Sequence, residues 1–454
     1  MLEDKKIVQF EKWLDHNNIE DVEIMVSDFA GISRGKMVPK DKFIEGLRKD
    51  GLRMPENLFS LTIDCDFIGN DFITDVEEDL YLIPDINTLT MVPWNITPTA
   101  CVVCDLVKDD GSPTNISPRQ VLINVLKLYK DKGWKAKVAP EFEFFLLANQ
   151  ADNELAPCPP TGRSGKQLWD KGLYSMDGTD DFSELFEDVY QYCEIMNIPI
   201  DTLTQEAGPA QFEINMHHND PLKVADQAFY FKRLIKQAAI RRGVFVSFMA
   251  KPYPDEFGSA MHIHQSVLAA SDGKSIFADK NSKDTALFLS HIAGLQKYIP
   301  ALMPIFAPYA NSYLRFGSSL SSPANLHWGL ENRSVGLRVP AGDNRSARRV
   351  ENRIAGSDVN PYLVIAASLL AGYLGMIENL KPSKPLTDSA YDLESFKLPE
   401  HFLTSLNNFT KSKLIKKMLS EEFVTTFADV KKKEYLANFG VLSPWEIRYL
   451  LMNV

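Results

Sequence analysis

The chain has 454 residues, 45% of them hydrophobic and 24% charged, and its formal net charge is −11 at pH 7. A chain of this length exceeds what one hydrophobic core usually supports, so two domains are expected. An acidic protein repels nucleic acid, and the N-terminal segment MLEDKKIVQF carries charges where a signal peptide needs an apolar core. The composition therefore predicts a folded cytoplasmic protein without a nucleic-acid partner.

The region 1–112 shows an amphipathic helix followed by short strands and proline-rich connections. The helix is expected over residues 7–14, and VEIMVSDFAG is typical of a strand. The stretch from Asp28 to Gly35 is expected to form a hairpin turn. It resembles a Walker phosphate loop only in part, because it is one residue short and has Met37 where Ser or Thr must bind magnesium. This region is therefore predicted to be a small α+β domain.

The pattern changes near residue 113, after which strand-like and helical segments alternate to the end of the chain. Ser117 is the expected N-cap of the first of these helices, which begins with proline. Helices are expected over residues 118–133, 220–243 and 361–378, and a last helix opens with the capping box Ser443-Pro444-Trp445-Glu446. These features predict a second, larger domain over residues 113–454.

Two features could indicate a membrane or a metal, but both favour core packing. Residues 361–377 carry no charge, yet they begin with proline, include Tyr362 and Ser368 and lack a basic flank, so a buried helix is expected. Of the five cysteines, Cys101 and Cys104 form a CxxC pair. In a strand these two positions face opposite sides, and no second pair completes a zinc site. The sequence predicts neither a membrane partner nor a zinc centre.

Polar residues recur at every second position in the segments APEFEFFLL, GPAQFEINM, GSAMHIHQSV and ARRVENRI. This alternation places the following residues on shared strand faces: Glu141 with Glu143, Gln211 with Glu213, His262 with His264 and Ser266, and Arg349 with Glu351 and Arg353. One such segment alone is typical of a surface strand. Four together predict an open curved sheet that lines a charged cavity. Carboxylates so close repel one another unless a cation joins them, which indicates Mg²⁺ or Mn²⁺.

A group of arginines lies close in the sequence to the last of these acids, Glu351, and most of them precede it. They are Arg315, Arg333, Arg338, Arg345, Arg348, Arg349 and Arg353. Because several of them alternate with valine, leucine and proline, they are expected inside the protein rather than on a solvated face. Guanidinium groups bind phosphate and carboxylate groups with two parallel hydrogen bonds. Carboxylates for a metal beside arginines for phosphate predict phosphoryl transfer.

The segments GSAMHIHQS, NSYLRF, ENRSVGLRVP, RRVENR and NPYLVIAASLLAG resemble the signature segments of type I glutamine synthetases, in that family's order. The resemblance extends over nearly the whole chain and is strongest to the gamma-glutamylpolyamine branch, which includes gamma-glutamylputrescine synthetase. It implies an α+β fold, with a small N-terminal beta-grasp domain over 1–112. A large catalytic domain over 113–454 would hold a curved antiparallel sheet covered by helices. It also implies a homo-oligomer, a double-ringed dodecamer with active sites between subunits.

The resemblance further implies roles for individual residues. Glu143, Glu206 and Glu213 would hold one divalent ion, and Glu141, His262 and Glu351 another, with two or three Mg²⁺ or Mn²⁺ ions in each site. Arg315, Arg353, Gly258 and Ser321 would bind substrate, and His264, Arg338 and Arg349 would contact ATP. Arg333 and Arg338 would act on the transferring group, while Asp28 of a neighbouring subunit would face the amine.

The implied reaction joins the side-chain carboxylate of glutamate to an amine. ATP first converts the carboxylate to a gamma-glutamyl phosphate, which the amine then attacks. Ser321 stands where glutamine-forming members carry a glutamate, and Phe257 stands where they carry an asparagine. The first departure favours an organic amine such as putrescine over ammonia. A glutamine synthetase that uses ammonia and a catalytically inactive regulatory homologue are the alternatives.

Overall fold

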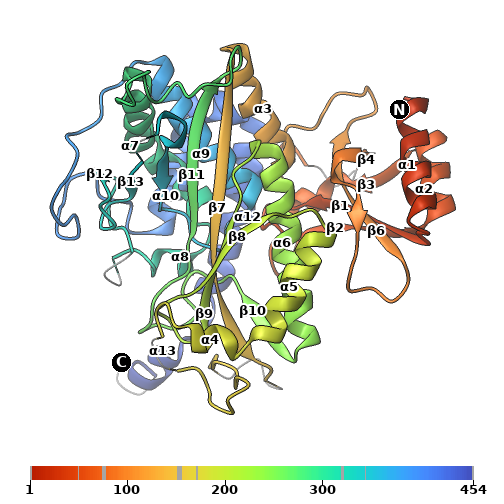
Figure 1. Cartoon of the computed structure of the whole chain (residues 1–454), viewed down its shortest axis with the longest axis horizontal. Helices are drawn as coiled ribbons and strands as arrows, with labels where there is room; N and C mark the ends of the chain where they lie inside the picture. The colour runs from red at the N-terminus through yellow and green to blue at the C-terminus, as the bar shows by residue number, and fades with distance from the viewer. Residues whose placement is uncertain are drawn as a thin grey trace.

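The computed structural model describes residues 3–49, 51–73, 78–150, 156–169, 172–317, 322–342 and 344–451. Ser321 lies outside these described residues. The chain forms two sheets with helices around them, and Figure 1 shows the N-terminal strands with α1 (Asp4–His16) and α2 (Lys40–Arg48) beside the larger body. The helix expected over residues 7–14 is the central part of α1.

The N-terminal sheet has the strand order β2-β1-β6-β4-β3, and β5 pairs with β6. Its strands are β1 (Asp21–Ser27), β2 (Ser33–Pro39), β3 (Leu52–Pro55), β4 (Asp79–Pro84), β5 (Thr90–Met91) and β6 (Thr99–Val107), with short 3₁₀ helices at Glu56–Ser60 and Ile86–Thr88. Strands β1 and β6 run parallel. Cys101 and Cys104 are both buried in β6, as core residues would be.

The hairpin between β1 and β2 is shorter than the sequence indicates. The amide of Asp28 donates to the carbonyl oxygen of Ile32 at 3.2 Å, which closes the turn, and β2 begins at the next residue. Gly35 therefore lies inside β2, opposite Met25. A Cβ atom at Gly35 would lie 1.9 Å from the carbonyl oxygen of Ile24. This glycine thus permits a close approach between strands and does not form the turn.

The second sheet has the order β12-β13-β14-β11-β7-β9-β8, and β10 pairs with β7. Its strands are β7 (Trp134–Ala148), β8 (Ile200–Gln205), β9 (Gln211–Met216), β10 (Val244–Ser247), β11 (Met261–Ala269), β12 (Trp328–Leu330), β13 (Leu337–Val339) and β14 (Val350–Asn352). Strands β12 and β13 run parallel, and the pairings among β7 to β11 and β14 are antiparallel. The expected α+β fold is confirmed. The four segments with alternating polar residues become the adjacent strands β14, β11, β7 and β9.

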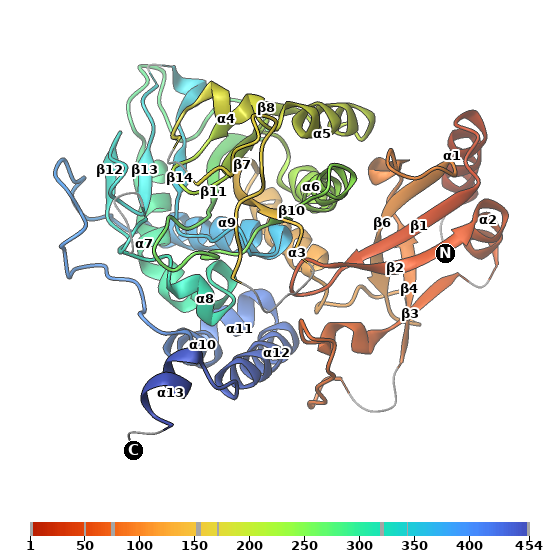
Figure 2. The same ribbon diagram turned by 90° about the horizontal axis from the view of Figure 1, so that it is seen from below.

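Helices α3, α6 and α9 pack against this sheet, and Figure 2 shows them together with the C-terminal helices. The helices of this part are α3 (Pro118–Asp131), α4 (Met176–Asp180), α5 (Ser183–Ile195), α6 (Pro221–Arg241), α7 (Ala286–Phe306), α8 (Ala310–Tyr313), α9 (Pro361–Ile377), α10 (Phe402–Lys411), α11 (Lys413–Leu419), α12 (Glu421–Phe439) and α13 (Pro444–Tyr449), with a 3₁₀ turn at Arg345–Ala347. The uncharged segment is the buried helix α9. Within the described residues no helix combines the length and apolar character needed to cross a bilayer.

The helix caps follow the sequence closely. Ser443 and Glu446 form the expected capping box, because the Ser443 hydroxyl accepts from the Glu446 amide at 3.2 Å and the Glu446 carboxylate accepts from the Ser443 amide at 2.7 Å. Ser117 occupies the N-cap position of α3, but its side chain makes no capping hydrogen bond. The proline at the first turn of α3 needs no amide partner, which lowers the demand on that cap.

A buried arginine joins the N-terminal sheet to the helices of the larger body. Arg119 on α3 forms two hydrogen bonds with Asp226 on α6, each 2.9 Å long. The same guanidinium reaches Asp85 after β4 at 2.7 Å and Asp105 on β6 at 2.5 Å. Tyr362 on α9 donates to Asp226 at 2.7 Å. One charged group therefore holds the N-terminal sheet to three helices of the larger body.

Candidate active site

At the centre of the second sheet, two pairs of site residues face each other across neighbouring strands. His262 lies opposite Glu141 in the β11–β7 register, and Glu143 lies opposite Glu213 in the β7–β9 register. The Nδ1 atom of His262 is 3.2 Å from a Glu141 oxygen, and its Nε2 atom is 3.8 Å from a Glu143 oxygen. The imidazole of His262 is therefore surrounded by carboxylate oxygens.

His264 extends the cluster toward β14, where it lies opposite Glu351. Arg349 donates from Nε to Nδ1 of His264 at 3.1 Å, and Nε2 of His264 lies 2.8 Å from a Glu141 oxygen. Because a guanidinium can only donate, Nδ1 must act as the acceptor. The proton of the neutral ring then lies on Nε2 and is donated to Glu141.

Glu351 is almost completely buried, with 1% of its side chain exposed, and is held by two arginines. Arg338 and Arg353 each donate to one of its two oxygens at 2.6 Å. Burial alone would raise the pKa of Glu351, but the charges of Arg353 and His262 lower the pKa to about 2. Glu351 is therefore ionised at neutral pH, with both oxygens already oriented.

Glu143 on β7 and Glu213 on β9 have the opposite tendency. Burial and the nearby Glu206 raise the pKa of Glu143 to about 8. Burial and the charges of Glu141 and Glu143 raise the pKa of Glu213 to about 9. Burial also raises the pKa of Glu206. In Glu141, by contrast, burial is outweighed by hydrogen bonds from His262 and His264, and its pKa is lowered.

This donor set fits a divalent cation. Carboxylates that are too crowded to ionise together are stabilised when a cation lies between them, and oxygen ligands with one imidazole suit Mg²⁺ or Mn²⁺. Among the described residues, two sets have ligand atoms within 4.8 Å of one another: Glu141, His264 and Glu351, and Glu141, Glu213 and His262. Neither set equals the grouping that the family resemblance implies. Glu143 and Glu206 belong to neither set, and His264 takes a place expected for His262.

Gly258 and Arg315 lie at the Glu143 end of the cluster. A Cβ atom at Gly258 would lie 2.5 Å from Cγ of Arg315 and 2.7 Å from the carbonyl oxygen of Ala250, so only glycine fits there. The Arg315 guanidinium is buried and donates to the carbonyl oxygen of Ile354. Burial lowers the pKa of Arg315 to about 10, so the group stays cationic at neutral pH.

Some residues of the site carry no predicted role. The side-chain amide of Gln211 donates to the Gly258 carbonyl oxygen at 2.9 Å and lies 3.5 Å from a Glu143 oxygen. A cavity of about 430 Å³ beside the cluster is lined by Glu141, His264, Arg349, Lys137 and His217, among others. The two-residue period of β7 places Lys137 on the same face as Glu141, so the alternation could have included it.

The family "glutamine synthetase, catalytic domain" matches residues 115–450. The chain belongs to the glutamine synthetase family. Glutamate–isopropylamine ligase of Pseudomonas sp is 33% identical to it over 460 residues, with 98% of each chain covered. Gamma-glutamylputrescine synthetase PuuA of Escherichia coli (strain K12) is 32% identical, with 96% of this chain and 92% of the relative covered. A solved structure of ligand-free GmaS has a TM-score of 0.83 and 25% identity, covering 97% of this chain and 98% of that one.

In this glutamine synthetase family member, Asp28 lies apart from the cluster. Its carboxylate accepts from Nε of Arg34 at 2.8 Å and from the amide of Ile32 at 2.8 Å, and burial raises its pKa. Its carbonyl oxygen accepts from the side chain of Asn360 at 2.7 Å. Within the described residues, none of these hydrogen bonds of Asp28 involves a residue of the carboxylate and histidine cluster. Arg333 is exposed, near the charge of Glu206, so the expectation that it lies inside the protein is wrong.

Proposed function

We propose that the chain is an ATP-dependent ligase that joins the side-chain carboxylate of glutamate to an organic amine through a gamma-glutamyl phosphate. One observation carries the proposal most directly. Glu141, Glu213 and His262 meet on one face of the sheet, and Arg338 and Arg353 lie beside them on Glu351. A cation site bordered by guanidinium groups is what the transfer of a phosphoryl group to a carboxylate needs.

The proposed roles are those that the family resemblance implies, although the structure groups the candidate metal ligands differently. One divalent ion is assigned to Glu143, Glu206 and Glu213, and another to Glu141, His262 and Glu351. When bound, such ions supply the positive charge that stabilises a transferring phosphoryl group. Arg315, Arg353 and Gly258 are assigned to glutamate, because Arg315 and Gly258 lie beside Glu143, while Arg353 binds Glu351. Arg333 and Arg338 are assigned to the transferring group.

ATP is assigned to the cavity of about 430 Å³ that borders the cluster. His264 and Arg349 lie where this cavity meets the carboxylates, so they suit the phosphate end of a nucleotide. Lys137 and His217 line the same cavity and add donors. A charge-assisted hydrogen bond from Arg349 to a phosphate oxygen would compensate for part of the hydration that both groups lose on binding.

An organic amine is proposed as the acceptor, and polyamines such as putrescine rank first. Two relatives are named for isopropylamine and putrescine. Ser321 stands where ammonia users carry a glutamate, so this chain has no negative side chain there to collect ammonium. Asp28 of a neighbouring subunit would then be the acid that orients the reacting nitrogen. Ammonia as acceptor and loss of catalysis are the competing functions.

The site proposed for the amine needs a second copy of the chain, so we also propose a homo-oligomer, with a dodecamer as the expected form. We assign the beta-grasp domain to 1–112 and the catalytic domain to 113–454. Apolar side chains at the C-terminal end are strongly exposed in the single chain, with Phe439 76% and Trp445 61% exposed. Exposed apolar surface of this kind is typical of an interface.

A panel of amines tests the proposed function. Phosphate release from ATP would be measured with glutamate and, in turn, putrescine, spermidine, isopropylamine, ethanolamine and ammonium. We expect the highest kcat/KM with an organic amine, and we expect Ser321→Glu to move the preference toward ammonium. Ammonium as the best acceptor would establish a glutamine synthetase instead. No phosphate release with any amine would establish an inactive homologue.

A further inference from the structure

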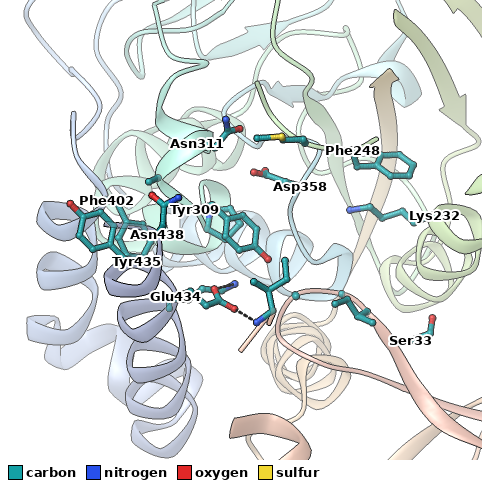
Figure 3. Close-up of a pocket in the computed structure, with 18 of the residues that line it drawn as sticks. Ser33, Lys232, Phe248, Tyr309, Asn311, Asp358, Phe402, Glu434, Tyr435 and Asn438 are labelled. Atoms are coloured by element: carbon teal, nitrogen blue, oxygen red, sulfur yellow. Dashed lines mark hydrogen bonds and ion pairs between the residues drawn. The ribbon is translucent and has the colours of Figure 1, made fainter. Parts of the chain in front are cut away.

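A second cavity, of about 770 Å³, lies between the tip of the β1–β2 hairpin, α6 and the C-terminal helices (Figure 3). Its walls are mainly apolar and aromatic, with Phe248, Met249, Tyr309, Phe402 and Tyr435 contributing. None of the residues proposed to bind metal, ATP or glutamate lines it, although one wall is the hairpin tip from Ala30 to Ser33, which follows Asp28. Cavities of this size with apolar walls and a few polar groups are typical ligand sites.

Two lysines of α6 give this cavity an unbalanced charge. Lys232 and Lys236 lie four positions apart on the helix, so their ammonium groups are neighbours that repel each other. Within the described part of the chain neither lysine forms an ion pair. The other cations of the lining do so, because Arg233 binds Glu23 and Lys431 binds Glu434 at 2.8 Å.

The environment of Lys232 shows the same imbalance. Its ammonium group donates to the carbonyl oxygens of Ser357 at 2.8 Å and Val359 at 2.9 Å, and lies 4.9 Å from the ring centre of Phe248. Burial and the charge of Lys236 lower the pKa of Lys232 to about 7. Asp358 also lines the cavity, and its charge acts on the pKa of Lys232 in the opposite direction, which offsets part of the imbalance. Its carboxylate accepts from the Ser312 hydroxyl at 2.6 Å and, within the described residues, forms no ion pair with either lysine.

We propose that this cavity binds a small organic carboxylate with an apolar body. The carboxylate would lie over Lys236 and Lys232, and the apolar part would pack against Phe248, Met249 and Tyr309. An anion there removes the repulsion between the two lysines and forms charge-assisted hydrogen bonds. An amine of the same length would be repelled by Lys236 and by the protonated form of Lys232, so it should bind less well than the carboxylate.

The floor of the cavity is connected to the active site. Lys232 holds the carbonyl oxygens of Ser357 and Val359, and the Ser357 hydroxyl donates to the carbonyl oxygen of Glu143 at 2.5 Å. The carbonyl oxygen of Ile354, in the same segment, accepts from Arg315. A carboxylate that binds Lys232 would therefore act on the segment that positions Glu143 and Arg315. We expect such a ligand to change the KM for glutamate.

Calorimetric titration without ATP and glutamate tests binding independently of the proposed reaction. The probes are hexanoate, hexylamine and hexan-1-ol, which share one apolar body. We expect hexanoate to bind and the other two to bind about tenfold or more weakly. Lys236→Glu should weaken hexanoate binding by about tenfold or more, while Lys223→Glu, the same charge change elsewhere on α6, should leave it unchanged.

A second measurement gives the effect on the active site. Hexanoate should shift the KM for glutamate at least about twofold in the wild type and not in Lys236→Glu. Equal binding of hexanoate and hexylamine would overturn the proposal, as would undiminished binding in Lys236→Glu. A structure of the assembled protein with side chains of a second copy filling the cavity would also overturn it. Binding with an unchanged KM would overturn the link to the active site.

Discussion

Arg338 donates to one oxygen of Glu351 at 2.6 Å and Arg353 to the other at 2.6 Å, so the carboxylate is fixed between two guanidinium groups. Glu351→Gln keeps the size of the side chain but removes its charge. If the carboxylate binds a divalent ion, kcat/KM should fall by about a hundredfold or more, while the fold is kept. Phosphate release at saturating Mg²⁺ measures the first effect, and circular dichroism measures the second.

Glu331→Gln is the matched control for that variant. Glu331 also contacts Arg338, at 3.3 Å, but 52% of its side chain is exposed and it lies outside the cluster. We expect its activity to stay within about threefold of wild type, because exposed ion pairs contribute little. Similar losses in Glu331→Gln and Glu351→Gln would show that Arg338, and not a metal, explains the effect.

The two arginines that flank β14 should affect different substrates. Arg349 contacts His264 beside the cavity assigned to ATP, and Arg353 binds Glu351 near the residues assigned to glutamate. Arg349→Ala should mainly raise the KM for ATP, and Arg353→Ala the KM for glutamate. Each lost charge-assisted contact should cost about 2 kcal/mol. Initial rates with one substrate varied at a time measure both constants, and equal effects on both substrates would contradict the assignment.

The pKa shifts of the cluster predict how metal-free protein responds to pH. The pKa values of Glu143 and Glu213 are raised to about 8 and about 9 in the folded state from an ordinary value of 4.5. The folded state therefore binds more protons than the unfolded state in this range, so stability falls as pH rises from about 4.5 to about 9. The pKa of Glu351 is shifted in the opposite direction, to about 2. Its contribution to stability is therefore lost only as pH falls below about 4.5 toward about 2.

Mg²⁺ should reverse the loss of folding stability at high pH, because the ion replaces the protons between the carboxylates. We expect the increase in melting temperature on adding Mg²⁺ to be larger at pH 8.5 than at pH 6. Glu213→Gln removes the carboxyl group whose pKa is raised to about 9, so it should flatten the pH dependence of the metal-free protein. A gain from Mg²⁺ that is equal at both pH values would argue against a metal between these carboxylates.

Much of the site could be predicted because strand alternation is a local property. The period of two placed Glu141 with Glu143 and His262 with His264 before any strand pairing was known. Which of these residues lie close enough to share one metal ion could not be predicted in the same way. Which residues of neighbouring strands meet depends on register, and the structure brings His264 to Glu141 at 2.8 Å.

Contacts between distant segments could not be predicted from the sequence either. Arg119 pairs with three aspartates that lie 14 to 107 positions away, and no local pattern connects them. The cavity that contains Lys232 is formed by the β1–β2 hairpin, α6 and α12, which meet only after folding. The sequence predicts a hairpin turn that extends to Gly35, whereas Gly35 lies inside β2, where the nearby Ile24 carbonyl oxygen leaves no room for a side chain.

The close packing of α7 against α9 gives the last prediction. A Cβ atom at Gly375 on α9 would lie 2.1 Å from the carbonyl oxygen of Ser290 on α7, and one at Gly294 would lie 2.2 Å from that of Ala371. Alanine normally favours a helix over glycine, yet here the methyl group must push two backbones apart. Gly375→Ala should therefore destabilise the fold by about 2 kcal/mol, as overpacked cores do. Gly440→Ala is the control, since its Cβ atom would meet nothing closer than 3.4 Å at the end of α12. Urea unfolding of both variants measures the difference, and a Gly375→Ala protein as stable as wild type would contradict the tight contact between α7 and α9.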